Sequence, residues 1–312
     1  GPENFSLARR YGYYRLIYCM TEGLPPAIAG RSLRAFSMLY WKESKIAQKL
    51  IQLRDSGKSI SEQIREKTLT NKSTKGQKLL DNLSGLMVKH KDNLVPIKQN
   101  QVEAIEEIIR EGVAVITGGP GTGKTTMVKA IVDIAEAGGL KVRLAAPTGK
   151  AARRAEKSTE RPSCTIHRLL EGDSMGGFVR NESNPLDCDV LLIDEFSMSD
   201  VDITYDLMCA IHPDTTLIII GDSDQLPSVG SGRVLGDIIE SDQICVVRLK
   251  SVLRQADQSP IITAAHMINS GQIPDLPSSD AWELILCGKD EIAAQVELNV
   301  KDALRRKFGT NE

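Results

Sequence analysis

The sequence predicts an α/β protein in which a parallel sheet carries helices on both faces and a small all-helical domain precedes the sheet. Two observations support the sheet. Residues 96–270 alternate short apolar runs with segments of helical periodicity, which is the pattern of parallel α/β folds. Three of the apolar runs end directly in polar or glycine-rich loops. A third observation supports the leading domain, because residues 3–95 show mostly helical spacing.

Five apolar runs are the candidate strands: Val113–Thr117, Lys141–Ala145, Val190–Asp194, Thr216–Ile220 and Ile244–Leu249. Before residue 96 we expect three helices, over Ser32–Arg54, Ile60–Leu69 and Gln77–Lys89. Ligands of open α/β sheets bind beyond the carboxyl ends of the strands. The loops that follow the five runs are therefore the candidate functional site.

Composition indicates a soluble globular protein, with 312 residues that are 41% hydrophobic and 26% charged. No apolar run reaches the roughly 18 residues of a membrane helix, and no signal-peptide pattern is present. The six cysteines are dispersed, without a CxxC pair. This usage fits a reducing environment and disfavours a structural zinc site. We therefore expect a cytoplasmic protein with no membrane contact.

The charges are distributed unevenly along the chain. Residues 1–100 contain 18 Lys and Arg against 8 Asp and Glu, whereas the remaining residues contain 21 against 33. A basic segment beside an acidic core favours a polyanion partner for the N-terminal part, or a protein partner that contacts its basic helices. A solvated basic helix face explains the same charges, and charge alone does not choose between them.

A glycine-rich turn, Gly118–Thr126, follows the first apolar run and precedes a helical segment that begins near Met127. Strand, glycine loop, Lys-Thr and helix in this order are the context of a phosphate-binding loop. Its backbone N–H groups and the helix N-terminus are expected to bind the phosphates of ATP. Lys124 would contact the β- and γ-phosphates, and the Thr125 hydroxyl would hold Mg²⁺. The residues expected at the nucleotide are Gly119, Pro120, Gly121, Thr122, Gly123, Lys124, Thr125 and Thr126.

Two later loops complete the expected nucleotide site. The apolar run 190–193 leads into Asp194 and Glu195, about 70 residues after the phosphate loop. Asp194 would support Mg²⁺ through water, and Glu195 would orient and deprotonate the attacking water. In the loop Gly221–Ser228, Gln225 is placed to hydrogen-bond the γ-phosphate and that water, although an ordinary polar turn explains the same residues.

Several motifs, in this order and spacing, resemble the RecD-like branch of superfamily 1 DNA helicases. They are Gly118–Thr126, Ala145–Arg153, Thr165–Leu170, Asn184–Leu186, Asp194–Met198, Gly221–Gly232, Arg254–Ala256 and Ile261–Gly271. The resemblance covers about residues 96–275 and implies a P-loop NTPase domain of the RecA-like type. It further implies an ATP-dependent 5′→3′ DNA helicase motor that acts on single-stranded DNA, in repair or recombination.

The resemblance also implies roles for single residues. Gln101 matches the residue that recognises adenine in these helicases. Gln225 matches the residue that contacts the γ-phosphate, and Arg254 matches an arginine finger. Lys124, Glu195, Gln225 and Arg254 are then the catalytic set, and Thr125 and Asp194 the metal set. The residues expected to grip single-stranded DNA are Pro147, Thr148, Gly149, Lys150, Thr165 and His167.

Residues 172–186 predict a small hairpin that turns at Gly176-Gly177. In RecD-like helicases a hairpin at this place acts as a strand-separating pin, so the resemblance implies that an exposed Phe178 stacks on the last base pair. A plain surface hairpin, with Phe178 packed on the domain, is the alternative.

After residue 275 nothing resembles the second motor domain of these helicases. Residues 276–312 contain only a possible strand, Trp282–Leu286, and a charged helix, Asp290–Lys307. We therefore expect a fragment that binds ATP, hydrolyses it weakly and does not unwind DNA alone. Two functions stay open: the ATPase motor of a DNA helicase, or an ATP-gated DNA- or protein-binding adaptor without unwinding activity.

Overall fold

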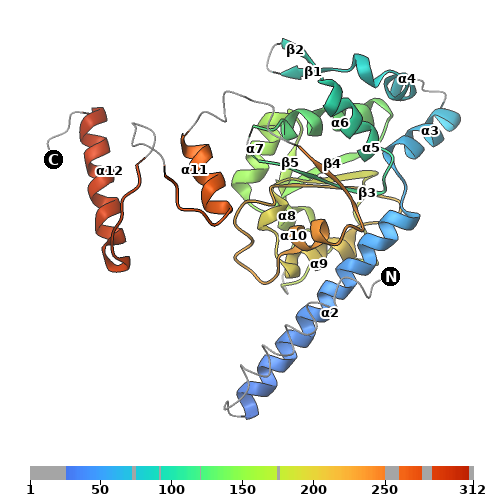
Figure 1. Cartoon of the computed structure of the whole chain (residues 1–312). Helices are drawn as coiled ribbons and strands as arrows, with labels where there is room; N and C mark the ends of the chain where they lie inside the picture. Colours follow the sequence, from blue (N-terminus) through green and yellow to red (C-terminus); the bar gives the residue numbers. More distant parts are fainter. Residues whose placement is uncertain are drawn as a thin grey trace. The chain divides into compact units, whose positions relative to one another are not determined.

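The computed structural model describes residues 26–71, 75–90, 93–119, 121–173, 176–249, 260–275 and 283–308. Contacts divide the chain into two units, residues 1–252 and residues 253–312. The first unit is built on a six-stranded sheet with the strand order β5-β4-β6-β7-β3-β8, and every neighbouring pair in it is parallel (Figure 1). The predicted fold class, a parallel sheet with helices, is confirmed.

All five predicted strands are present, with each end within one residue of its predicted place. Together with one further strand, β5, they make up the sheet: β3 (Val113–Thr117), β4 (Val142–Ala146), β5 (Ser163–Thr165), β6 (Val190–Ile193), β7 (Thr216–Gly221) and β8 (Cys245–Arg248). The edge strand β5 was not predicted, because its three residues lie among polar neighbours and show no apolar run.

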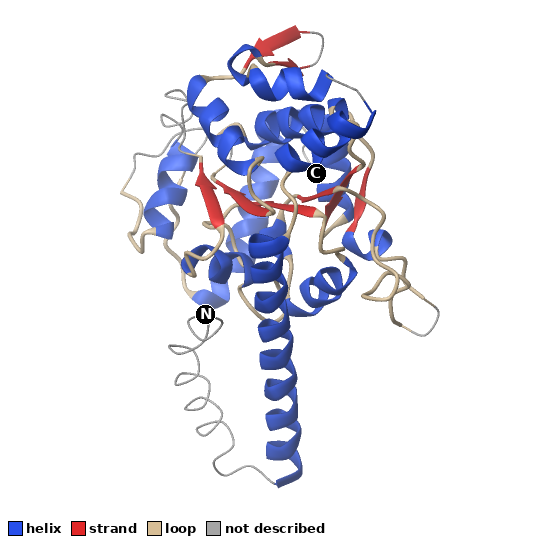
Figure 2. Cartoon of the chain, turned by 90° about the vertical axis from the view of Figure 1, so that its right-hand side faces the viewer, coloured by secondary structure: helices blue, strands red, loops and turns tan. Residues whose placement is uncertain are grey.

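Helices cover both faces of the sheet, and Figure 2 shows the strands between two helical layers. Successive strand residues point to opposite faces. In β3, Ala114 and Ile116 join one buried cluster, whereas Val113 and Val115 join the other. The first cluster also contains side chains of α3 (Ile60–Asn71), α5 (Gln99–Ile108) and α6 (Lys124–Ala137). The second contains side chains of α2 (Pro26–Ser56), α8 (Ile166–Leu169), α9 (Val201–Ala210) and α10 (Val234–Glu240). The helix α7 (Gly149–Thr159) packs against β4, β5 and α6.

The helical N-terminal part is present, but the predicted helix Gln77–Lys89 is wrong in its second half. The helix α4 covers Lys75–Asp81 and is followed by a short 3₁₀ helix, η2 (Leu83–Gly85). The chain then forms an antiparallel hairpin of β1 (Met87–His90) and β2 (Asn93–Pro96). Met87 is 45% exposed and Val88 only 2%. This alternation is the period of a strand and not of a helix.

The N-terminal helices are part of the same core as the sheet. Leu50 and Leu53 of α2 are buried in one cluster, and Ile60 and Ile64 of α3 in the other. Deleting residues 1–95 would remove these side chains and expose both faces of the sheet. Such a deletion therefore measures folding, and not the contribution of the N-terminal charges to DNA binding.

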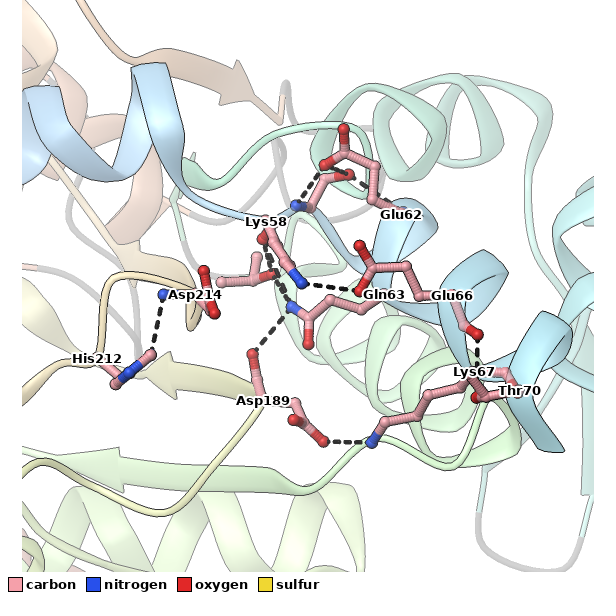
Figure 3. A network of polar contacts seen from close by, with 11 residues as sticks. Lys58, Glu62, Gln63, Glu66, Lys67, Thr70, Asp189, His212 and Asp214 are labelled. Carbon is pink, nitrogen blue, oxygen red and sulfur yellow. Dashed lines mark hydrogen bonds and ion pairs between the residues drawn. The ribbon is translucent and has the colours of Figure 1, made fainter.

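Polar contacts also attach α3 to the amino ends of two strands (Figure 3). The Gln63 side chain is 6% exposed, and its Nε2 donates to the Asp189 carbonyl at 3.2 Å and to the Thr216 hydroxyl at 2.9 Å. Lys67 pairs with the Asp189 carboxylate at 2.7 Å. Because Asp189 and Thr216 stand at the starts of β6 and β7, these bonds fix α3 at the sheet edge opposite the candidate functional loops.

The helices α4 and α6 approach closely at two glycines, Gly76 and Gly138. A Cβ added at Gly76 would lie 2.4 Å from the Gly138 Cα, which is backbone and cannot rotate away. We expect Gly76→Ala to destabilise the chain by about 1–3 kcal/mol, because overpacking forces the two helices apart. Thermal unfolding measures the effect. Gly172→Ala is the matched control, since a Cβ there meets nothing within 4 Å; equal midpoints for the two variants would contradict the prediction.

The second unit contains α11 (Pro260–Asn269), a 3₁₀ helix η4 (Lys289–Glu291) and α12 (Ile292–Phe308). The predicted C-terminal helix is confirmed, beginning as η4. The predicted strand Trp282–Leu286 is wrong for residues 283–286, which have no regular structure, and Trp282 lies outside the described residues. Across the part of the chain that the structure describes, no helix is long and apolar enough to span a membrane.

Candidate nucleotide site and DNA interface

The phosphate-binding loop joins β3 to α6 at the carboxyl edge of the sheet. Gly121 and Gly123 have φ values of 75° and 94°, a left-handed backbone that suits glycine. The Thr122 hydroxyl donates to the Gly119 carbonyl at 2.9 Å and closes the turn. Pro120 lies outside the described residues. The loop leads into the N-terminus of a 14-residue helix, whose free N–H groups and dipole favour an anion.

Lys124 lies across this loop. Its ammonium group donates to the Gly118 carbonyl and, at 3.0 Å, to the Gly119 carbonyl. Burial lowers the pKa of Lys124, while Asp222, Glu195 and Asp194 oppose this shift through their negative charges. The structure thus holds a half-buried cation at the mouth of the loop, where a phosphate would replace the two carbonyls as its partner.

Gln101 lies beside the loop, as its predicted role at the nucleotide requires. Its side chain is 9% exposed, and its Oε1 accepts from the Lys98 N–H at 3.3 Å. A Cβ added at Gly123 would lie 2.5 Å from the Gln101 Nε2. The Gln101 amide therefore packs directly on the loop that precedes α6.

The two acidic residues follow β6. Asp194 Oδ1 accepts from the Glu195 N–H at 2.9 Å. Burial raises the pKa of Asp194, so its carboxylate is a poorly solvated anion that a nearby cation would stabilise. Glu195 has a φ of 53°, which is uncommon for a residue with a side chain. This backbone turn directs the two consecutive carboxylates into one pocket.

The phosphate loop and these two acids do not follow neighbouring strands. The strand β7 pairs with both β3 and β6 and so separates them. The loop after β7 consequently places Asp222 in the middle of the site. Asp222 is 3% exposed, and it is the first of the acids whose charge acts on Lys124. Sequence reasoning included Asp222 in a motif but gave it no role.

Gln225 is hydrogen-bonded to Asp222. Its Nε2 donates to Asp222 Oδ2 at 3.2 Å, and its backbone N–H donates to the Asp222 carbonyl at 3.3 Å. The Gln225 side chain is exposed at the carboxyl edge. Its predicted contact with a γ-phosphate stays a prediction. Arg254 lies outside the described residues.

One pocket brings four of the predicted residues together. It is lined by Lys124, Thr125, Asp194, Glu195 and also Arg154 of α7. Arg154 Nη1 donates to Glu195 Oε1 at 3.1 Å. Sequence reasoning missed Arg154, because no local pattern shows which acid an exposed helix arginine will meet.

The residues present fit ATP with a divalent cation. Gly119 has no left-handed φ, and an added Cβ there would meet nothing within 4 Å, so the space in front of this glycine is open to a ligand. Among the described residues, no group of three or more His, Cys, Asp or Glu could hold a metal ion. A site made of the Thr125 hydroxyl, Asp194 and nucleotide phosphates would offer only oxygen ligands, which suit a hard divalent cation.

The candidate DNA residues stand at the same edge, after β4 and β5, which are paired in the sheet. The Thr148 hydroxyl caps α7 by accepting from the Ala151 N–H at 3.2 Å, and the Thr165 hydroxyl caps α8 by accepting from the Arg168 N–H at 3.2 Å. Each hydroxyl keeps its own proton to donate to a phosphate. Gly149, Lys150 and His167 are exposed, and Pro147 is half-buried.

In the segment 172–186, of which residues 174 and 175 lie outside the described residues, Gly176 has a φ of 84°. Isolated antiparallel bridges join Gly172 to Phe178 and Asn181 to Asn184. Phe178 is partly buried against the core, and its ring centroid lies 5.9 Å from that of His167. This packing favours the plain surface hairpin over an exposed stacking residue.

Comparisons with known proteins agree with these features. A family model described as an AAA domain matches residues 96–290. The ATP-dependent RecD2 DNA helicase of Deinococcus radiodurans is 40% identical over 178 residues, which are 57% of this chain and 24% of that protein. The RecBCD enzyme subunit RecD of Haemophilus influenzae is 36% identical over 174 residues, 46% of this chain and 27% of that protein.

These relatives confirm the resemblance to RecD-like helicases that the motifs predict, and the chain spans about a quarter of their length. The Pif1 helicase structure from Candida albicans aligns with 66% of this chain and 55% of that chain, at 21% identity and a TM-score of 0.43, a similarity too low to add to the argument. Because the AAA domain model matches more than half of its residues, the chain belongs to the AAA domain family.

Proposed function

We propose that this chain supplies the ATP-hydrolysing and DNA-gripping part of a RecD-type DNA helicase motor. The observation that carries the proposal is the single pocket that Lys124, Thr125, Asp194 and Glu195 line. The candidate DNA residues stand at the same edge of the same sheet, at the ends of β4, which pairs with β6, and of β5, which pairs with β4. The relatives, an ATP-dependent DNA helicase and a RecBCD enzyme subunit, support ATP as the nucleotide and DNA as the partner.

The chemistry follows from the side chains. Glu195 accepts a proton from a water molecule, the water oxygen bonds to the γ-phosphorus, and the bond from that phosphorus to the β,γ-bridging oxygen breaks. Lys124 offsets negative charge on the phosphates, and Gln225 senses whether the γ-phosphate is present. When bound, Mg²⁺ at Thr125 and Asp194 would neutralise charge on the β- and γ-phosphates.

Single-stranded DNA would contact the starts of α7 and α8. The open first turn of α7 offers backbone N–H groups at Gly149 and the Lys150 ammonium, which bind phosphates without reading sequence. The arrangement therefore favours an unpaired strand of any sequence. Translocation and unwinding are proposed for the longer protein type that the relatives represent, since the motor cycle needs closure around ATP.

The test is ATP turnover by the chain with and without an oligothymidine strand, which forms no hairpins. We expect the strand to raise the turnover rate, and Lys150→Ala to weaken strand binding and reduce the slope of log affinity against log salt by about 0.7. Lys141→Ala is the matched control, because Lys141 precedes β4 at the opposite edge and pairs there with Asp187 at 2.9 Å. If the chain bound ATP but did not hydrolyse it at any DNA concentration, the result would contradict the proposed motor function and favour an ATP-gated adaptor.

A further inference from the structure

The exposed face of α7 connects the candidate DNA contact to the catalytic carboxylate. The helix begins at Gly149, inside the candidate DNA loop, and its buried residues are Ala151, Ala152, Ala155 and Thr159. Arg154 follows on the same helix, and its side chain is 75% exposed. Its guanidinium nevertheless donates to Glu195, the group that the proposed function assigns as the base, at 3.1 Å.

Lys150 and Arg154 are four residues apart on α7 and therefore lie on the same face of the helix. Side chains at this spacing have Cβ atoms about 5–6 Å apart. A DNA phosphate held by Lys150 would thus lie within reach of the Arg154 guanidinium. Guanidinium groups bind phosphate and carboxylate oxygens with the same fork of N–H donors. The strand and Glu195 would compete for one arginine.

This competition affects hydrolysis directly. While Glu195 Oε1 accepts from Arg154, the ion pair holds the carboxylate toward α7 and limits the directions in which its oxygens can reach a water molecule. A base must have a free oxygen within hydrogen-bond reach of the attacking water. The Glu195 side chain is 19% exposed, so the pocket leaves it few other positions while the ion pair lasts.

We propose that Arg154 is a positioning residue that restrains Glu195 in the absence of DNA and releases it when a strand phosphate binds beside Lys150. This inference rests on the proposed function and adds to it the way in which the strand would stimulate turnover. The helix between Lys150 and Arg154 needs no movement, because only the guanidinium changes its partner. The observation behind it is the ion pair between an exposed arginine of the DNA-side helix and the catalytic acid.

The first test is ATP turnover of Arg154→Ala with and without oligothymidine. An ion pair with a mostly exposed arginine is a weak restraint, so we expect the DNA-free rate to rise by a factor of about two to five. The ratio of stimulated to DNA-free rates should fall correspondingly when both rates are measured at saturating ATP. Arg153→Ala is the control, since it removes an exposed arginine from the same helix and should leave the DNA-free rate unchanged. A DNA-free rate for Arg154→Ala at or below that of the wild type would overturn the proposal.

The second test measures strand affinity against salt without nucleotide. If Arg154 moves to a phosphate, Arg154→Ala should reduce the salt slope by about 0.7, and Arg154→Lys should retain it. An unchanged slope for Arg154→Ala would overturn the proposal even if the chain had no measurable turnover. Absent turnover in the wild type would count against the proposed function, whereas DNA-stimulated turnover with an unaltered response in Arg154→Ala would count against Arg154 alone.

Discussion

Replacing Glu195 by glutamine is expected to lower ATP turnover by roughly 10²–10⁴-fold while ATP binding persists. Glutamine keeps the shape of the side chain and its hydrogen-bonding reach but cannot accept the proton of the attacking water. Lys124, which we propose to bind the phosphates, is unaltered in this variant. Turnover is measured by phosphate release at saturating ATP, and binding by titration with a fluorescent ATP analogue.

Glu171→Gln is the matched control for this experiment. Glu171 has a φ of 55°, close to the 53° of Glu195, and it pairs with Arg180 at 2.8 Å. Like Glu195, it has a positive φ and pairs with an arginine, but it is not among the residues that line the pocket. Turnover should be unchanged in Glu171→Gln. Near-normal hydrolysis by Glu195→Gln would show that another group takes the proton.

Replacing Lys124 by methionine is expected to weaken ATP binding by roughly 100-fold, because hydrogen bonds from a charged donor to phosphate are lost. The same change should slightly raise the stability of the nucleotide-free chain. Burial lowers the pKa of Lys124 in the folded state, so folding disfavours its charged form. Methionine fills similar space without a charge. Thermal unfolding and ATP titration together test both effects.

The pH dependence of that stability difference has a definite sign. The folded-state pKa of Lys124 lies below the unfolded value, so below the folded pKa the wild type carries the full cost of its buried charge. Wild-type stability then rises as pH increases through the folded pKa toward 10.5. The advantage of Lys124→Met should therefore shrink as the pH is raised toward 10.5.

Lys141→Met is the control for stability, because the hydrogen bond that Lys141 donates to Asp187 raises the pKa of Lys141, and the folded state therefore favours its charge. Lys141→Met should therefore not raise the stability of the chain. A Lys124→Met variant that binds ATP normally, or that is less stable than the wild type at neutral pH, would contradict the role given to this lysine.

The sequence by itself determined the features that depend on neighbouring residues. Apolar runs located β3, β4, β6, β7 and β8 to within one residue, because a buried parallel strand needs several consecutive apolar side chains. The phosphate loop and the pair Asp194-Glu195 could also be located from the sequence, because each of them directly follows the apolar run of its strand. The hairpin of β1 and β2 was missed, because four-residue strands beside a helical stretch leave only a weak alternation at Met87 and Val88.

Only the tertiary structure decided which of these pieces meet. The position of β7 between β3 and β6 brings the buried Asp222 beside Lys124, and the packing of α7 on β4 and β5 brings Arg154 to Glu195. The N-terminal helices also pack into the hydrophobic core of the sheet, through Leu50, Leu53, Ile60 and Ile64. Strand order and helix packing are contacts between segments far apart in the chain. Local periodicity records whether a residue is buried but not which partner buries it.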